Sequence, residues 1–105
     1  MVAKIYCFDI DDTICFTNGT EYSTAVPIPD RIARINQLFA EGHTIKFHTA
    51  RGSKTGIDWR ELTEKQLIIW GVQYHELHLG KPFADFYIDD KGIKDSDFEW
   101  NMPSD

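Results

Sequence analysis

The chain has 105 residues, 42% of them hydrophobic, and a formal net charge of −6. This length accommodates a single domain with one core and excludes a separate lid domain. The acidic balance opposes non-specific attraction to nucleic acid and to anionic membrane surfaces, so neither is an expected partner. No stretch approaches the roughly 20 apolar residues that span a bilayer, and the amino terminus lacks the character of a signal peptide, which favours a cytoplasmic protein with reduced cysteines.

The first expected element is a strand that ends among carboxylates. An apolar run that starts at Lys4 is rich in β-forming residues and leads into Asp9, Asp11 and Asp12. Residues 14–28 come next; they are polar and contain glycine, and they are long enough for a mobile hairpin or flap over the site. Three carboxylates so close together repel one another, and a bound divalent cation is the simplest remedy.

The following segment predicts a helix and a second strand. Pro29 suits the first turn of a helix, apolar residues then recur at helical spacing, and Gly42 supplies the stop. Residues 44–49 predict the second strand. The loop at residues 51–57 holds two glycines and two basic residues, which favours contact with a phosphate group.

A second helix and two more strands complete the alternating pattern. Asp58 and Glu61 resemble a capping box at the start of that helix. Residues 76–79 predict the third strand, and the apolar segment 83–88 predicts a fourth. The residues expected on the buried face of the helix are Leu62, Leu67, Ile69 and Trp70.

The fourth strand leads into a second acidic pair, Asp89 and Asp90. Parallel strands joined by right-handed crossovers point the same way, so their carboxyl ends meet at one edge of the sheet. Asp9, Thr49 and Asp89 are therefore expected to converge although they are far apart in sequence. The pattern as a whole predicts an α/β fold.

Four short motifs in this order resemble the haloacid dehalogenase superfamily. The resemblance extends over about residues 5–90 and implies a three-layer, Rossmann-like parallel sheet flanked by helices. The matching residues are Asp9, Asp11 and Thr13 for the first motif, Thr49 for the second, Lys81 with Pro82 for the third, and Asp89 with Asp90 for the fourth.

The resemblance implies a magnesium-dependent phosphatase. Asp9 would attack phosphorus to form an aspartyl-phosphate, and Asp11 would protonate the leaving alcohol and later activate water. Thr49 and Lys81 would position and neutralise the phosphoryl oxygens. The implied magnesium ligands are Asp9, the backbone carbonyl of Asp11, Asp89 and, directly or through water, Asp90.

Two basic residues after the second strand are weaker candidates. Arg51 and Lys54 would hold the substrate's phosphate or a second anionic group, or else they are solvated loop charges.

Neither gap between the motifs is long enough for a cap domain, so the chain resembles a capless member of the superfamily. An uncovered site needs a bulky substrate or a neighbouring subunit to exclude water, which favours a homo-oligomer. The stretches around Thr49 and Asp89 resemble small phosphatases of capsule or surface-polysaccharide synthesis, which implies a small sugar or polyol phosphate as substrate. Phosphorylated nucleotide ends and phosphoproteins stay open as substrates.

Two other classes of protein share some of these features. A response-regulator receiver domain also combines acidic residues, a phosphorylated Asp, a Thr and a Lys-Pro pair, but in a different order along the chain. A magnesium-binding module without activity is the second alternative, and the presence of both Asp9 and Asp11 argues against it.

Overall fold

The computed structural model of the chain describes residues 2–102 and is built on a parallel three-stranded sheet. The strand order is β1 (Ile5–Phe8), β4 (Thr44–Thr49), β5 (Glu76–Leu79). Helices α1 (Pro29–Ala40) and α2 (Arg60–Ile69) form the two crossovers between these strands. The expected α/β class and the first three parallel strands are confirmed.

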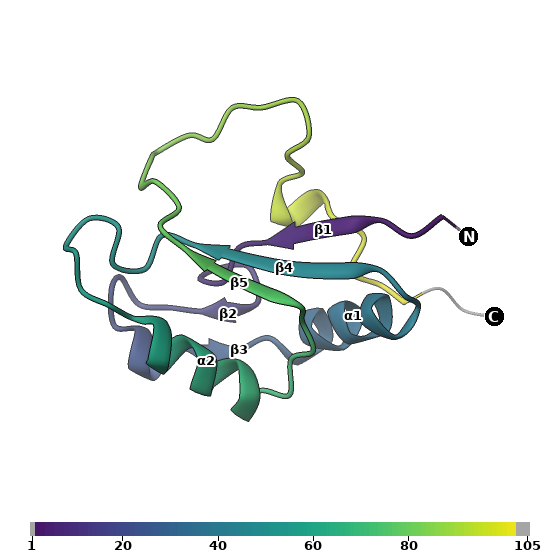
Figure 1. Ribbon diagram of the computed structural model, residues 1–105, viewed down its shortest axis with the longest axis horizontal. Helices are drawn as coiled ribbons and strands as arrows, with labels where there is room; N and C mark the ends of the chain where they lie inside the picture. Colours follow the sequence, from purple (N-terminus) through teal and green to yellow (C-terminus); the bar gives the residue numbers. More distant parts are fainter. Residues whose placement is uncertain (1, 103–105) are drawn as a thin grey trace.

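Both α-helices lie on the same face of the sheet (Figure 1). The crossovers from β1 to β4 and from β4 to β5 advance in the same direction, and right-handed connections then place both helices on one side. Within residues 2–102 no α-helix covers the opposite face, so the three-layer arrangement that the resemblance implies is not confirmed. No helix in that part is long and apolar enough to cross a membrane.

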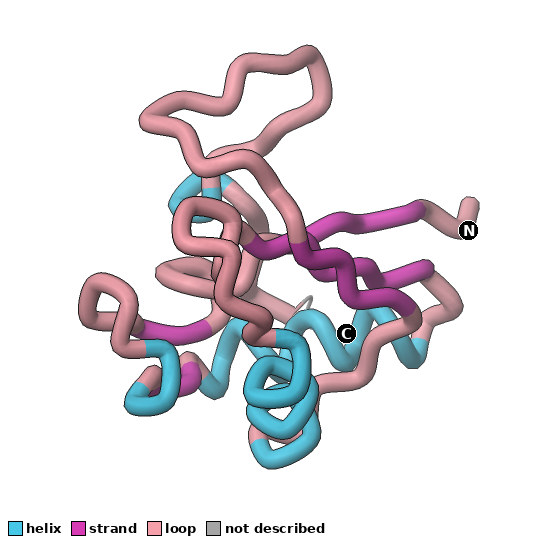
Figure 2. Tube along the Cα trace, turned by 60° about the vertical axis from the view of Figure 1, so that its left-hand side comes forward, coloured by secondary structure: helices cyan, strands magenta, loops and turns pink. Residues whose placement is uncertain are grey.

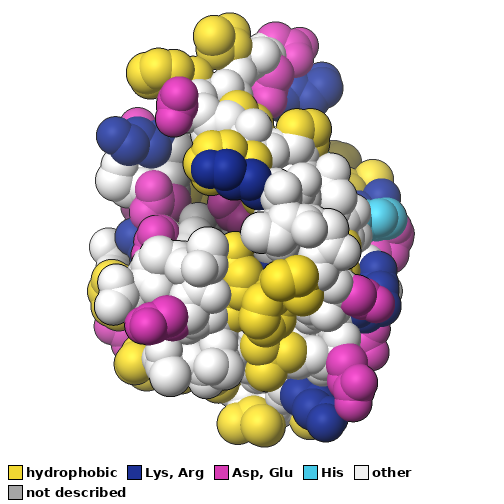
Figure 3. All heavy atoms as spheres, turned by 90° about the vertical axis from the view of Figure 1, so that its left-hand side faces the viewer, with side chains coloured by type: hydrophobic (Ala, Val, Ile, Leu, Met, Phe, Trp, Pro, Cys, Tyr) yellow, Lys and Arg dark blue, Asp and Glu magenta, His cyan; other side chains and the backbone are white. Residues whose placement is uncertain are grey.

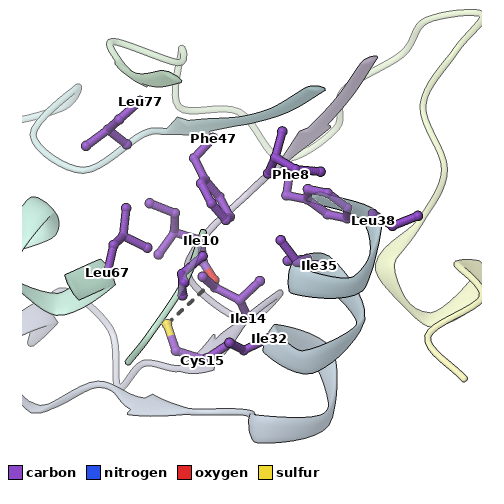
Figure 4. Packing of buried hydrophobic residues seen from close by; sticks show 12 residues of the cluster. Phe8, Ile10, Ile14, Cys15, Ile32, Ile35, Leu38, Phe47, Leu67 and Leu77 are labelled. Atoms are coloured by element: carbon purple, nitrogen blue, oxygen red, sulfur yellow. Dashed lines mark hydrogen bonds between the residues drawn. The ribbon is translucent and has the colours of Figure 1, made fainter. Parts of the chain in front are cut away.

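The core lies between the sheet and the helices (Figure 4). Helix α1 contributes Ile32, Ile35 and Leu38, whose spacing of three residues places them on one side of the helix. Strand β4 alternates strictly between buried and partly exposed residues, with Ile45 and Phe47 pointing into the core. Both helix α1 and strand β4 thus match the bounds that the sequence predicted.

The stretch after β1 forms a hairpin. Strands β2 (Cys15–Phe16) and β3 (Val26–Pro27) pair antiparallel, and the 3-10 helix η1 (Tyr22–Thr24) lies between them. The hairpin is attached to helix α2, because the Gln66 side chain donates a hydrogen bond to the Tyr22 carbonyl at 2.5 Å. It therefore packs beside the sheet instead of standing free of it.

The buried face of α2 differs from the prediction. Leu67 is fully buried, but Ile69 is 79% exposed. Two polar residues, Thr63 and Gln66, take buried positions on this helix because they bind the guanidinium of Arg51. The capping box is not formed either. Asp58 accepts a hydrogen bond from the backbone N–H of Arg60, two residues further along, whereas a capping box uses the N–H of the third residue after the cap.

The predicted fourth strand is absent. Residues 80–94 form a long loop that extends away from the sheet on the side opposite the helices (Figures 1 and 2). Its apolar side chains are exposed: Phe86 by 82% and Ile88 by 93%. An apolar run becomes a strand only where it finds a paired edge and a face to cover. Segment 83–88 has neither here, so the expectation of a strand was wrong.

The segment after this loop returns to the sheet and helix α1. A 3-10 helix, η2 (Asp95–Asp97), is fixed by an ion pair of 2.9 Å between Arg31 and Asp95. Phe98 and Trp100 then pack against the ring of Phe8 in β1.

Candidate functional site

A lysine and an aspartate from distant parts of the chain meet at the carboxyl end of the sheet. Asp9 directly follows β1, and Lys81 comes two residues after β5. The Lys81 Nζ atom lies 3.3 Å from Asp9 Oδ2, with the side chains 19% and 39% exposed. Figure 3 looks onto this end of the molecule, where acidic and basic side chains lie beside a hollow. These are two of the residues that the sequence assigned to the site.

Backbone contacts fix the position of Lys81. Its N–H donates to the Thr49 carbonyl at 3.1 Å, and its own carbonyl accepts the Ser53 hydroxyl at 2.6 Å. The ammonium group also lies 4.1 Å from the centre of the Tyr87 ring, close enough for a cation–π interaction. The loops that follow β4 and β5 are therefore joined at the site.

Asp9 is oriented by its own turn. Its Oδ1 atom accepts the backbone N–H of Ile10 at 2.8 Å, and Oδ2 faces Lys81. The next residue, Ile10, is fully buried and anchors this turn in the core. One carboxylate oxygen is thus held by the backbone, while the side chain stays accessible from solvent.

Asp11 points toward a different partner. Its carboxylate accepts two hydrogen bonds from Arg51, Nε to Oδ2 at 3.0 Å and Nη2 to Oδ1 at 2.8 Å. The Thr17 hydroxyl donates a third to Oδ1 at 2.6 Å. The Asp11 side chain is 21% exposed, so it lies at the border between the site and the interior.

Arg51 is not placed to bind a substrate directly, which corrects one of the two expectations for it. Its side chain is fully buried, and Nη1 donates to Thr63 and Gln66 in addition to the bonds with Asp11. Lys54, the other candidate for substrate binding, lies in an exposed loop with its ammonium 5.2 Å from the centre of the Phe83 ring.

Thr49 is fully buried, and its hydroxyl accepts the backbone N–H of Arg51 at 3.1 Å. This is the local turn contact that serine and threonine commonly make. In this arrangement the hydroxyl shapes the turn between β4 and the following loop, and its carbonyl holds Lys81.

The second acidic pair does not join the first. The Asp89 carboxylate accepts the backbone N–H groups of Lys91 and Gly92, and these two bonds lower the pKa of Asp89 below its ordinary value. Asp90 is exposed in the same loop. Among residues 2–102, no three His, Cys, Asp or Glu side chains form a group that could hold a metal ion. The expected convergence of Asp9 and Asp89 fails because the strand that would have carried Asp89 is a loop.

A pocket of about 200 Å³ lies between the loops after β4 and β5, and Gly80, the residue before Lys81, lines it. Gly52, on its wall, has a φ of +80°, and a Cβ at this position would overlap the Ile57 carbonyl oxygen. Glycine is therefore needed here for the loop to fold back on itself. The remaining lining residues are Arg51, Ser53, Ile57, Asp58, Leu79 and Gly80.

Sequence reasoning missed the residues that surround Arg51. Thr63 and Gln66 were not singled out, although polar residues three apart on an otherwise apolar helix face indicate a buried polar partner. Tyr22 was also missed: its ring lies 4.8 Å from the guanidinium carbon of Arg51 and packs edge-on against Trp59 at 5.0 Å.

Comparison with known proteins identifies a shared fold but no activity. No protein-family model matches the chain, and no curated protein matches it significantly. A crystal structure of a structural-genomics target from Vibrio cholerae is similar, with a TM-score of 0.80 and 28% sequence identity. The match covers 89% of this chain and 85% of that one. That protein carries no functional name, so the similarity supports the fold alone.

Proposed function

We propose that the protein is a magnesium-dependent phosphomonoester hydrolase of the haloacid dehalogenase type that acts through an aspartyl-phosphate on Asp9. The observation that carries this proposal is the approach of Lys81 Nζ to within 3.3 Å of Asp9 Oδ2 at the carboxyl end of a parallel sheet. A nucleophilic carboxylate beside a cation is what phosphoryl transfer needs, because negative charge must be brought to and stabilised at phosphorus.

The proposed reaction has two displacements. In the first, an Asp9 oxygen bonds to phosphorus while the bond to the leaving alcohol breaks, and the alcohol oxygen takes a proton from Asp11. In the second, Asp11 takes a proton from water, whose oxygen bonds to phosphorus as the Asp9–phosphorus bond breaks. Lys81, whose Nζ atom is 3.3 Å from Asp9 Oδ2, would offset the charge of the phosphoryl oxygens in both steps.

The donor set suits magnesium in part. Magnesium needs only one or two protein carboxylates together with waters and substrate phosphate, and Asp9 offers a partly exposed carboxylate. Asp9 and the backbone carbonyl of Asp11 would hold the ion, which supplies charge neutralisation at the phosphoryl group. Asp89, the further ligand that the sequence resemblance implies, would have to leave its turn with Lys91 and Gly92.

The pocket between the loops after β4 and β5 favours a small leaving group. At about 200 Å³ it is below the usual size of pockets for drug-sized ligands, and it has room for a sugar or polyol. Together with the sequence resemblance, this size makes a small sugar or polyol phosphate of surface-polysaccharide synthesis the proposed substrate class. Nucleotide ends and phosphoproteins are the alternatives, and turnover rates across phosphorylated sugars, polyols, nucleotides and peptides would rank them.

Turnover of p-nitrophenyl phosphate tests the proposed activity. Wild-type protein with magnesium should release nitrophenol, chelation should stop the release, and Asp9→Asn should abolish it while the circular dichroism spectrum stays native. Asp85→Asn is the matched control, since it makes the same change at an exposed aspartate in the loop. Turnover that survives in Asp9→Asn would contradict the proposal. Stable phosphorylation without turnover would point to the receiver-like alternative.

The Asp9 side chain is 39% exposed, and a neighbouring subunit in a homo-oligomer would cover it. The proposed homo-oligomer is checked by light scattering coupled to size-exclusion chromatography, in which a monomer mass at working concentration would contradict it.

A further inference from the structure

A buried arginine stands directly behind the proposed acid–base residue. Arg51 is fully buried, and three of its nitrogens are engaged: Nε and Nη2 by Asp11, and Nη1 by Thr63 and Gln66. Burying a guanidinium is costly unless its charge is paired and its N–H groups are bonded. One carboxylate, that of Asp11, and two buried polar side chains, Thr63 and Gln66, therefore hold the Arg51 guanidinium in one orientation.

The arrangement acts on Asp11 in a specific way. The two parallel hydrogen bonds from a planar guanidinium fix both the position and the plane of a carboxylate, which a lysine cannot do. Oδ1 of Asp11 accepts from Arg51, from Thr17 and, at 3.8 Å, from the Cys15 thiol, whereas Oδ2 accepts only the bond from Arg51 Nε among the contacts of residues 2–102. Each carboxylate oxygen can accept about two hydrogen bonds, so Oδ2 retains a lone pair.

We propose that Arg51 is a positioning residue that fixes the place and the plane of the Asp11 carboxylate, and that Thr63 and Gln66 hold Arg51 in turn. This inference rests on the proposed function, because it concerns the proton that Asp11 gives to the leaving alcohol.

The same network reaches the hairpin. Gln66 accepts from Arg51 with its Oε1 and donates from its Nε2 to the Tyr22 carbonyl, while the Tyr22 ring packs on the guanidinium. The hairpin that borders the site is thus attached to the residue that orients Asp11. A change at Gln66 should act on Asp11 without touching it.

Two substrates with different leaving groups distinguish a positioning role of Arg51 from a merely structural one. A nitrophenolate leaves without a proton, whereas the alkoxide of an alkyl phosphate needs one, so misplacement of Asp11 slows only the second kind of substrate. The ratio of kcat/KM for p-nitrophenyl phosphate to kcat/KM for glycerol phosphate measures this difference, since kcat/KM reports the first displacement. Partial unfolding lowers both values equally and leaves the ratio unchanged.

The experiment compares Arg51→Lys with Arg60→Lys. Arg60 lies on α2, where it bonds to Glu64 and the Leu77 carbonyl, and no hydrogen bond joins it to Asp11 within residues 2–102. Arg51→Lys should raise the ratio by about tenfold or more, and Arg60→Lys should leave it unchanged. In an Asp11→Asn background Arg51→Lys should add nothing further to the ratio, because it acts through Asp11.

Gln66→Met serves where Arg51→Lys fails to fold, and it should raise the ratio in the same direction by a smaller factor. The positioning role is overturned if the ratio is unchanged in folded, active Arg51→Lys or Gln66→Met. It is also overturned if Arg51→Lys has its full effect on the ratio in the Asp11→Asn background. Neither result contradicts the phosphatase activity. Wild-type protein that turns over neither substrate would overturn the proposed function itself, and this inference with it.

Discussion

Lys81 Nζ lies 3.3 Å from Asp9 Oδ2 across 72 residues of sequence. The contact depends on two loops, because the backbone of Lys81 is held by the Thr49 carbonyl and the Ser53 hydroxyl. The geometry of the site is therefore set by the ends of β4 and β5 together with the turn after β1.

Loss of the Lys81 charge should reduce catalysis far more than stability. Lys81→Met should lower kcat/KM for p-nitrophenyl phosphate by about 100-fold or more, since it removes a cation from the developing charge at phosphorus. Lys65→Met is the control, because the Lys65 side chain is 66% exposed and pairs with Glu61 on α2. Equal activity of the two variants would remove Lys81 from the site.

In the loop after β4, replacing Gly52 should destabilise the fold more than replacing Gly56. Gly52 and Gly56 share a φ near +80°, but a Cβ at Gly52 would overlap the Ile57 carbonyl oxygen, whereas nothing lies within 4 Å of one at Gly56. Gly56→Ala should cost about 1 kcal/mol of unfolding free energy for the left-handed backbone alone. Gly52→Ala should cost at least about 1 kcal/mol more, as measured by urea denaturation. Equal costs would show that the loop is free to open.

His48 should make the fold less stable in mild acid. Burial, followed by the nearby charges of Lys81 and His78, lowers the pKa of His48 below its ordinary value, while Asp9 opposes the shift. As the pH falls below about 6.5, His48 binds a proton more readily in the unfolded chain than in the folded one, so the free energy of unfolding decreases. Above that pH His48 is neutral in both states and does not change the free energy of unfolding. His48→Gln should therefore lose less unfolding free energy than wild type between about pH 7 and pH 5. An identical loss in both proteins would contradict this.

The role of Asp89 is decided by magnesium titration. If Asp89 leaves its turn to bind the ion, as the sequence resemblance implies, Asp89→Asn should raise the magnesium concentration for half-maximal activity by about tenfold. Asp85→Asn, in the same loop, should leave it unchanged. An unchanged midpoint in Asp89→Asn would restrict the carboxylate ligands to those beside β1.

The sequence predicted the parts of the fold that local patterns determine. Helix α1 and strands β4 and β5 have the expected bounds, because periodic apolar residues and turn-forming glycines specify them directly. Segment 83–88 has the composition of a strand but not the environment of one, and composition alone cannot distinguish the two cases.

The site shows the same division. The approach of Lys81 to Asp9 follows from the order of the strands, so it was predictable. The partnership of Asp11 with Arg51 was not, because nothing local indicates that a loop arginine is buried. The polar residues Thr63 and Gln66 on the inner face of α2 indicate a buried polar partner, but the structure is needed to show that this partner is Arg51.

The most direct test of the account is the chemical state of Asp9 during turnover. In Asp11→Asn, p-nitrophenyl phosphate should still transfer its phosphoryl group, but water is no longer activated, so the phosphorylated protein accumulates. Acid quenching followed by peptide mass spectrometry should then find one phosphoryl group on the peptide that contains Asp9, matched by a burst of nitrophenol. Nitrophenol released with no adduct, or an adduct on any other residue, would contradict the account.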